Sequence, residues 1–355
     1  MADSSSRSRK RPRGDQADLS TLAVYTYHGP LAAHNLPASR TSDYLIGLQR
    51  TVFGQREPRF SVFSITSSST GDFLMMDEPL HRELFGGGGT IRWNCLYIHE
   101  ATSARTGAEI SGSLSALCDH LAEANIPVLN ICTLARNFMI VRETVAPGAL
   151  TTLHAALVPP SSARHIAKPG DNTGADGDPS RNSDAQNVDD SASDGSGARR
   201  FRLTLELKRE KVIVGSLSVA ELKACCHALL TLFFLRRTRP TFQHFFEMAG
   251  EASLIVEESA LEALRQSEPA SSEALLAALK PSLSRGWRVL SITAPCGSEG
   301  VGLLGAVCLP LSRLPLLNVS TLDESFVLIR EEHLSEALRL LGAAGFDVAH
   351  EGVTL

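Results

Sequence analysis

One stretch of this chain occurs twice at a constant spacing, and no other feature constrains the fold as much. Residues 126–144, IPVLNICTLARNFMIVRET, share their layout with residues 314–332, LPLLNVSTLDESFVLIREE. Eight identical residue pairs are each 188 positions apart, Asn130 and Asn318 among them. Each copy has two apolar runs around a polar bend, which is the pattern of a β-hairpin. The chain therefore repeats at least one structural unit.

The same plan extends over the rest of the chain. Apolar periodicity and turn residues predict strands over 22–28, 59–67, 72–78, 93–100, 127–133, 138–143, 201–207, 211–218, 241–248, 252–258, 287–295, 314–321 and 325–331. They predict helices over 42–53, 112–125, 221–235, 260–266, 301–313 and 333–346, and a further helix closing the second unit. Pro310 predicts that the helix over 301–313 bends or ends early.

The order strand, helix, strand, strand, helix thus recurs four times. This order predicts an α+β protein of four tandem ferredoxin-like units in two halves, with a small antiparallel sheet covered on one face by helices in each unit. A single unit leaves a sheet edge uncovered, and such edges are usually paired or shielded. We therefore expect units two and four, the near-duplicates, to pair.

Two polar segments flank these units. The segment 159–200 is rich in Ser, Asp, Gly and Pro, which predicts a disordered linker. The N-terminal cluster RSRKRPR, from Arg7 to Arg13, is typical of either a nuclear address or a solvated tail. The expected organisation is a disordered tail over 1–19, unit one over 20–88, unit two over 91–158, the linker, unit three over 201–265 and unit four over 286–350.

Composition indicates an intracellular, cytoplasmic protein, with a nuclear location as the alternative if the tail is an import signal. The net charge of -5 gives no general attraction to nucleic acid or to an anionic membrane. No stretch reaches the roughly 18 apolar residues that span a bilayer, and the polar N-terminus lacks the apolar core of a secretory signal. Seven cysteines without a C-x-x-C pair predict reduced, buried thiols.

The sequence contains no catalytic or metal-binding motif, so we expect neither an enzyme nor a cofactor or metal site. His227 is expected at a packing edge. Arg236, Arg237 and Arg239 are expected in a solvated turn after a helix, with a partner-binding patch as the alternative. Two glycine-bearing loops, 103–109 and 295–302, each join a strand to a helix start, where free backbone N–H groups favour an anionic group such as an α-carboxylate.

Several of these segments resemble a known family. LAEANIPVLNICTLARNFMIVRE, HALLTLFFLRRTRPTFQHFFEM and CGSEGVGLLGAVCLPL are similar to parts of the ACT units of the cytosolic arginine sensor (CASTOR) family. The resemblance covers nearly everything except the tail and the linker, and it is looser in unit one. It implies four ACT units and a free amino acid, arginine in that family, held between units two and four. It also implies a protein partner of the GATOR type in mTOR signalling, and a homodimer remains open.

The resemblance carries ligand-binding roles onto nine positions, whose backbone groups would hold the α-amino and α-carboxylate groups of the ligand. They are Pro127, Val128, Gly297, Glu299, Gly300, Gly302, Thr321, Leu322 and Ser325. Two of them depart from the family's pattern, which has a serine at Pro127 and an acidic residue at Ser325. A buried guanidinium needs a carboxylate partner, so Glu299, Asp323 or Glu324 would have to take that role.

Two other functions remain open at this point. One is a ligand-free ACT scaffold that binds proteins through sheet edges or the basic turn. The other is a regulatory subunit of a separate amino-acid biosynthetic enzyme.

Overall fold

A computed structural model of the chain describes residues 22–27, 29–40, 44, 47, 62–86, 91–100, 111–134, 136–157, 203–235, 239–248, 250–294 and 301–351. The expected tail and linker lie outside the described residues, as does the helix over 42–53 apart from Tyr44 and Gly47. The protein is of the α+β class, as the sequence predicts, and its strands form one fourteen-stranded sheet.

The first half of the chain contributes strands β1 to β7. Unit one comprises β1 (Leu22–Thr26), β2 (Leu31–Pro37), the short helix η1 (Ala38–Arg40), β3 (Val62–Ser68), β4 (Gly71–Asp77) and α2 (Glu78–Phe85). Unit two comprises β5 (Arg92–Glu100), α3 (Ser111–Glu123), β6 (Leu129–Cys132), β7 (Asn137–Arg142), η2 (Glu143–Val145) and α4 (Ala146–Leu157).

The second half repeats this plan. Unit three comprises β8 (Thr204–Ser218), α5 (Val219–Ala224), α6 (Cys226–Phe234), β9 (Phe242–Met248), β10 (Glu251–Glu257), α7 (Glu258–Ser267) and α8 (Pro269–Leu279). Unit four comprises β11 (Ser284–Thr293), α9 (Leu303–Cys308), β12 (Leu316–Ser320), β13 (Glu324–Arg330), η4 (Glu331–His333), α10 (Leu334–Ala343) and β14 (Val348–His350).

Apart from short 3-10 turns, the structure differs from the expected elements in six places. The sequence analysis missed β2, α2, α8 and β14, and the two strands expected over 201–207 and 211–218 are one continuous strand, β8. The helix expected over 221–235 is interrupted at Cys225, and α9 ends at Cys308, as Pro310 predicts. Pro269 at the start of α8 was a helix-start signal, but the polar residues around it masked that signal.

The sheet closes on itself. In units two, three and four the first strand pairs with the third and the third with the second, for example β5–β7–β6 in unit two; in unit one the corresponding order is β2–β4–β3, and β1 pairs with β5 instead. The path then runs β5–β2–β4–β3–β9–β10–β8–β11–β13–β12–β6–β7 and returns to β5, while β1 and β14 lie beside it on β5 and β8. All pairings are antiparallel except that of β14 with β8. Closure pairs the edges that single units would leave open.

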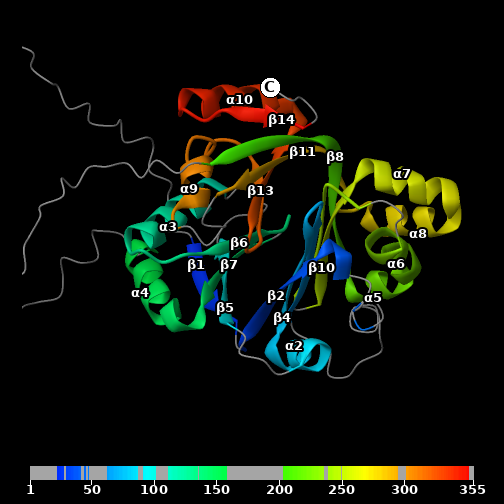
Figure 1. Cartoon of the computed structure of the whole chain (residues 1–355), viewed down its shortest axis with the longest axis horizontal. Helices are drawn as coiled ribbons and strands as arrows, with labels where there is room; N and C mark the ends of the chain where they lie inside the picture. The colour runs from blue at the N-terminus through cyan, green and yellow to red at the C-terminus, as the bar shows by residue number, and fades with distance from the viewer. Residues whose placement is uncertain are drawn as a thin grey trace, which may run out of the picture.

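The helices lie around the outside of this closed sheet (Figure 1). Four buried apolar clusters fill the protein, and one of them consists of strand residues alone, among them Trp93, Phe138 and Phe246. Strand side chains alternate between the two faces, so one set packs under the helices and the other fills the inside of the ring. None of the described helices combines the length and the apolar character needed to cross a membrane.

The two pairs of units are joined very differently. Units one and three meet along β3 and β9, where seven residues of each strand pair, from Val62 with Met248 to Ser68 with Phe242. Units two and four meet along β6 and β12, where a single residue pair, Ile131 with Val319, is in register. Units two and four do pair, but main-chain hydrogen bonds contribute little to the contact between them. We call this contact, and the one between units one and three, the two joints of the protein.

A partly buried ion pair joins unit three to unit one. Arg239 was expected in a solvated turn, but its Nη2 lies 2.8 Å from Asp72 Oδ1 and its Nε donates to the Ser68 carbonyl at 2.7 Å. Asp72 is buried, and a buried carboxylate needs a charged partner, which explains why Arg239 lies against the β3–β4 hairpin. Arg236 and Arg237 lie outside the described residues.

A buried histidine lies at the same joint. His244 on β9 is opposite Thr66 on β3, and its Nδ1 is 2.9 Å from Thr66 Oγ1. Burial lowers the pKa of His244 from 6.5 to about 3, because the charged imidazolium loses its hydration inside the protein.

We expect Arg239→Gln to lower the free energy of unfolding by about 3 kcal/mol, because it leaves the Asp72 carboxylate buried without its counter-charge. Urea unfolding would measure this change. The matched control is Arg265→Gln, which breaks an exposed pair with Glu262 and should change the free energy of unfolding far less. Equal losses in the two variants would contradict the structural role of Arg239.

His244 predicts a loss of stability in mild acid. Above pH 6.5 the histidine is neutral in both states, but below that value the unfolded chain takes up a proton that the folded chain does not. Between pH 7 and pH 5 this difference should remove about 2 kcal/mol of stability. Urea unfolding of His244→Gln over the same pH range should show a correspondingly smaller loss, and an unchanged pH dependence would disprove the assignment.

Candidate functional site

Helices α3 and α9 form the main contact between units two and four outside the strands. Gly302, at the start of α9, faces Ala122 of α3 so closely that a Cβ at Gly302 would lie 3.1 Å from that of Ala122. One turn further on, a Cβ at Gly305 would lie 2.6 Å from Asp119 Oδ1. The two glycines therefore let α9 approach α3, and Gly305 leaves room for a carboxylate.

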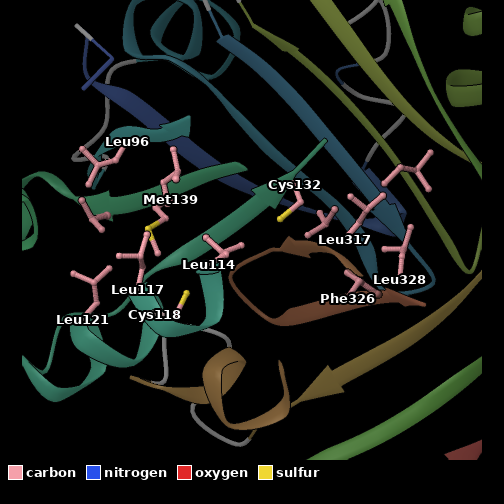
Figure 2. Packing of buried hydrophobic residues seen from close by; sticks show 14 of the residues in the cluster. Leu96, Leu114, Leu117, Cys118, Leu121, Cys132, Met139, Leu317, Phe326 and Leu328 are labelled. Carbon is pink, nitrogen blue, oxygen red and sulfur yellow. The ribbon is translucent and has the colours of Figure 1, made fainter. Parts of the chain in front are cut away.

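The sequence of α3 accounts for this contact. Leu114, Leu117 and Leu121 are buried and point toward the strands of unit two (Figure 2). Asp119 and Ala122 lie three positions apart on a different side of the helix, and these are the residues that face α9. The leucine side of α3 thus packs on the strands of unit two. The side that carries Asp119 and Ala122 contacts unit four.

Buried polar groups lie beneath the two helices in equivalent places. Asn130 Nδ2 donates to Cys118 Sγ at 3.4 Å in unit two, and Cys308 Sγ donates to Asn318 Oδ1 at 3.6 Å in unit four. The two asparagines are one of the pairs that recur 188 positions apart. In the described part of the chain, Asn130 Oδ1 is buried and accepts no hydrogen bond, which is uncommon for an interior amide oxygen.

The thiols at this joint are unsuited to nucleophilic chemistry. Burial raises the pKa of Cys118 and of Cys132 to about 12, and it raises that of Cys308 well above its usual value. The reactive form of cysteine is the thiolate, so these side chains act as small hydrophobic groups. Six cysteines are free thiols, five of them buried, as the sequence predicts; Cys296 lies outside the described residues.

The structure places the nine predicted ligand-binding residues in three groups. Gly297, Glu299 and Gly300 lie outside the described residues. Pro127, Val128 and Gly302 lie near the end of α3, where Pro127 and Val128 are half-buried and precede β6. The remaining three belong to the bend of the β12–β13 hairpin: Thr321, Leu322 and Ser325.

The hairpin residues point to opposite faces of the sheet. Ser325 Oγ donates to Ser320 Oγ at 3.2 Å. Ser325 shares a face of β13 with Val327 and Ile329, which pack with α9 on the outside of the sheet. Leu322 instead packs against the strand-only cluster inside the ring. The bend therefore has an outer side at the α3–α9 joint and an inner side. Whether the nine residues bind a ligand together stays a prediction.

Two of the three carboxylates expected to pair with a guanidinium, Asp323 and Glu324, are not between α3 and α9, and Glu299 lies outside the described residues. Asp323 accepts from Asn35 Nδ2 of unit one at 2.7 Å, and Glu324 precedes Ser325 and so points to the opposite face. The acidic residue that does face α9 is Asp119, which the sequence analysis missed. Burial raises the pKa of Asp119 above its usual value; the negative charge of Glu123 adds to this shift, and His120 opposes it.

The chemistry available at the outer joint is therefore hydrogen bonding and charge pairing by acceptor groups. Among the residues that the structure describes, no three His, Cys, Asp or Glu side chains are grouped so that they could hold a metal ion.

A scan of the chain against models of known protein families finds no match, and no curated protein matches its sequence. Aspartate kinase from Synechocystis is similar at a TM-score of 0.31 and 10% identity, over 96% of this chain and 58% of that chain. The ligand-free regulatory subunit of aspartate kinase from Thermus thermophilus gives 0.28 and 16%, over 41% and 96%. A Vibrio cholerae protein of unknown function, described as a possible transport protein, gives 0.29 and 15%, over 40% and 94%. These resemblances assign the chain to no family.

The close approach of α9 to α3 predicts that Gly305→Ala destabilises the protein. The new methyl group would collide with the Asp119 carboxylate, and overpacking of this kind costs about 1–3 kcal/mol, measurable by urea unfolding. Adding Asp119→Ala should restore much of the loss, because it removes the colliding group.

The control is Gly342→Ala in α10, where a Cβ would meet no atom within 4 Å. That change should be neutral or stabilising by up to about 1 kcal/mol. A similar loss at both glycines would mean that the α3–α9 contact is not the cause.

Proposed function

We propose that this protein is a non-catalytic regulator of the ACT type, which binds a free amino acid between units two and four and thereby controls a protein partner. The observation that carries the proposal is the contrast between the two joints. Seven paired residues fix unit one on unit three, whereas one pair and the α3–α9 contact connect unit two with unit four.

A regulatory ligand needs a joint that has two arrangements of similar free energy. It shifts the balance between them only by the difference in its affinity for the two. Separating β3 from β9 would break a long ladder of main-chain hydrogen bonds. Rearranging β6 and β12 would cost far less, because few such bonds are lost there. The joint between units two and four is therefore where a small molecule can change the structure.

The groups at this joint favour a ligand with hydrogen-bond donors. Asn130 Oδ1 is a buried acceptor that accepts no hydrogen bond from the described residues, and Asp119 is a half-buried carboxylate with a raised pKa. An ammonium group beside Asp119 would stabilise the ionised carboxylate and reverse that shift. The α-amino group of an amino acid supplies such donors, and the glycine loop over 295–302, of which only residues 301 and 302 are described, would receive the α-carboxylate.

The finer parts of the proposal rest on the resemblance of the sequence to the cytosolic arginine sensors. Through it we propose arginine or another cationic amino acid as the ligand and a GATOR-type complex in nutrient signalling as the partner. A cytoplasmic location is part of the same proposal. Ser325, where the family has an acidic residue, is the position that would set the preference for a cationic side chain.

Thermal unfolding against a panel of free amino acids tests the proposal. A ligand present at about 100 times its dissociation constant adds about 2.7 kcal/mol of stability. We expect at least one amino acid to raise the unfolding temperature at millimolar concentration. If none does, the amino-acid proposal fails and a ligand-free scaffold becomes the better explanation.

Ser325→Asp makes the test specific to the site. A carboxylate at this buried position should lower the unfolding temperature without ligand, and arginine or lysine should restore it more than leucine does. Ser272→Asp is the matched control, since Ser272 is equally buried but lies in α8, away from the joint. Recovery of both variants by arginine, or of neither, would contradict a site at Ser325.

A further inference from the structure

A cavity of about 180 Å³ lies between unit one and unit four, away from the joint described above. Its walls come from the end of β2, the β3–β4 bend and the β12–β13 bend. Asn35 and Asp323 are exposed and form its mouth, whereas Thr66 and Asp72 are buried and form its floor. At roughly 10–15 Å³ per water, this volume is large enough for a small organic molecule.

The repeat provides a built-in comparison for this cavity. Units two and three form the equivalent space between the β6–β7 bend and the β9–β10 bend, but it measures only about 20 Å³. The two bends of the near-duplicate hairpins have the same geometry. Thr133 Oγ1 donates to the Arg136 carbonyl at 3.1 Å and accepts from its N–H at 2.9 Å. Thr321 makes the same two bonds with Glu324, at 2.9 and 3.0 Å.

The two spaces differ in charge at corresponding positions. In the small space Arg136 reaches toward Glu251, the first residue of β10, at 4.0 Å. In the large cavity Glu324 takes the place of the arginine, 188 positions later, and Gly71 begins β4 as Glu251 begins β10. Gly71 cannot be larger, since a Cβ there would lie 2.4 Å from the Leu36 carbonyl oxygen. Compared with the small space, the large cavity therefore has an anionic side chain, Glu324, in place of Arg136 and no side chain in place of Glu251.

The other groups of the cavity do not neutralise this charge. Asp72 is paired with Arg239, and Asp323 accepts a hydrogen bond from the uncharged Asn35 amide. Burial raises the pKa of Glu324; Lys208 opposes the shift, and Asp323 and Glu206 add to it. Lys208 is itself paired with Glu206, so a bound cation would find both Asp323 and Glu324 available for charge pairing.

We propose that this cavity is a second binding site, which takes a small organic cation whose ammonium or guanidinium group lies beside Asp323 and Glu324. The cation supplies the positive charge that Arg136 provides in the equivalent space. The hydroxyl groups of Thr66 and Ser68 at the floor accept hydrogen bonds from further N–H groups of such a molecule. A metal ion fits less well, because the described residues contain no group of three ligating side chains.

This site is separate from the proposed amino-acid site. Glu324 and Ser325 are neighbours on β13, and their side chains point to opposite faces of the sheet. A cation in the cavity would touch units one and four, whereas the amino acid would lie between units two and four. The two ligands therefore act on opposite sides of the same bend.

The test uses amines that lack a carboxylate, so that the amino-acid site is not probed. Titration calorimetry with agmatine, which carries both an ammonium and a guanidinium group, should detect binding to the full-length protein. Tetramethylammonium, which has charge but no N–H donor, should bind at least about tenfold more weakly, and sodium chloride at equal ionic strength should not reproduce the response. Equal responses to all three would overturn the proposal.

Two substitutions of Glu324 should both reduce agmatine binding, but to different extents. Glu324→Gln should weaken agmatine binding about tenfold or more, because a charge-assisted hydrogen bond is lost. Glu324→Arg should abolish binding and raise the unfolding temperature of the free protein, because it places at position 324 the positive charge that Arg136 has at the corresponding position of the small space. Both variants should keep the bend, since Thr321 bonds only the main chain of residue 324.

Glu332→Gln is the matched control, because Glu332 is an exposed acid in the same unit. It should bind agmatine as the parent does. Unchanged binding in Glu324→Gln would overturn the cation site, whatever the amino-acid panel shows. Conversely, loss of every amino-acid response with agmatine binding intact would remove the proposed function and leave the cation site standing.

Discussion

The architecture depends on the pairing of one strand, β5. It pairs with β7 on one side and with β1 and β2 on the other. In the second half β8 has the same role between β10 and β11. These two strands join the units within each half, and the β3–β9 and β6–β12 pairings close the sheet. Closure leaves the helices only the outside, and a strand-only apolar cluster fills part of the inside. It also brings residues from different units together at two joints.

The two joints have different roles: on our proposals, the joint between units one and three stabilises the fold, and the joint between units two and four responds to a ligand. The β3–β9 ladder, with Arg239 on Asp72 and the buried His244 beside it, makes units one and three a rigid pair. Units two and four touch through one residue pair and through two helices that glycine allows to approach. On our proposals the β12–β13 bend is the element that responds, because one of its faces belongs to the weak joint and the other lines a charged cavity.

Local patterns were sufficient for the hairpins and for most helices, since alternation of apolar residues and turn chemistry act within a few residues. They failed at β2, whose residues LAAHNLP have little strand preference and are held by β4 along their whole length. They failed at β14 for the same kind of reason, because it exists through its pairing with β8. At the candidate site, the resemblance pointed to the β12–β13 bend but missed Asp119, whose helical neighbours gave no sign that it faces α9.

The sequence by itself determined the α+β class, the order of elements in units two, three and four, and the duplicated hairpin, because each depends on periodicity and turns that are local. Only the tertiary structure decided that unit one lies against unit three, and how many residues pair at each contact between units. It decided that Arg239 neutralises Asp72, that Ser325 and Glu324 face opposite sides, and that one of two equivalent spaces is open while the other is nearly filled. These outcomes depend on contacts between residues far apart in the chain, which no local pattern encodes.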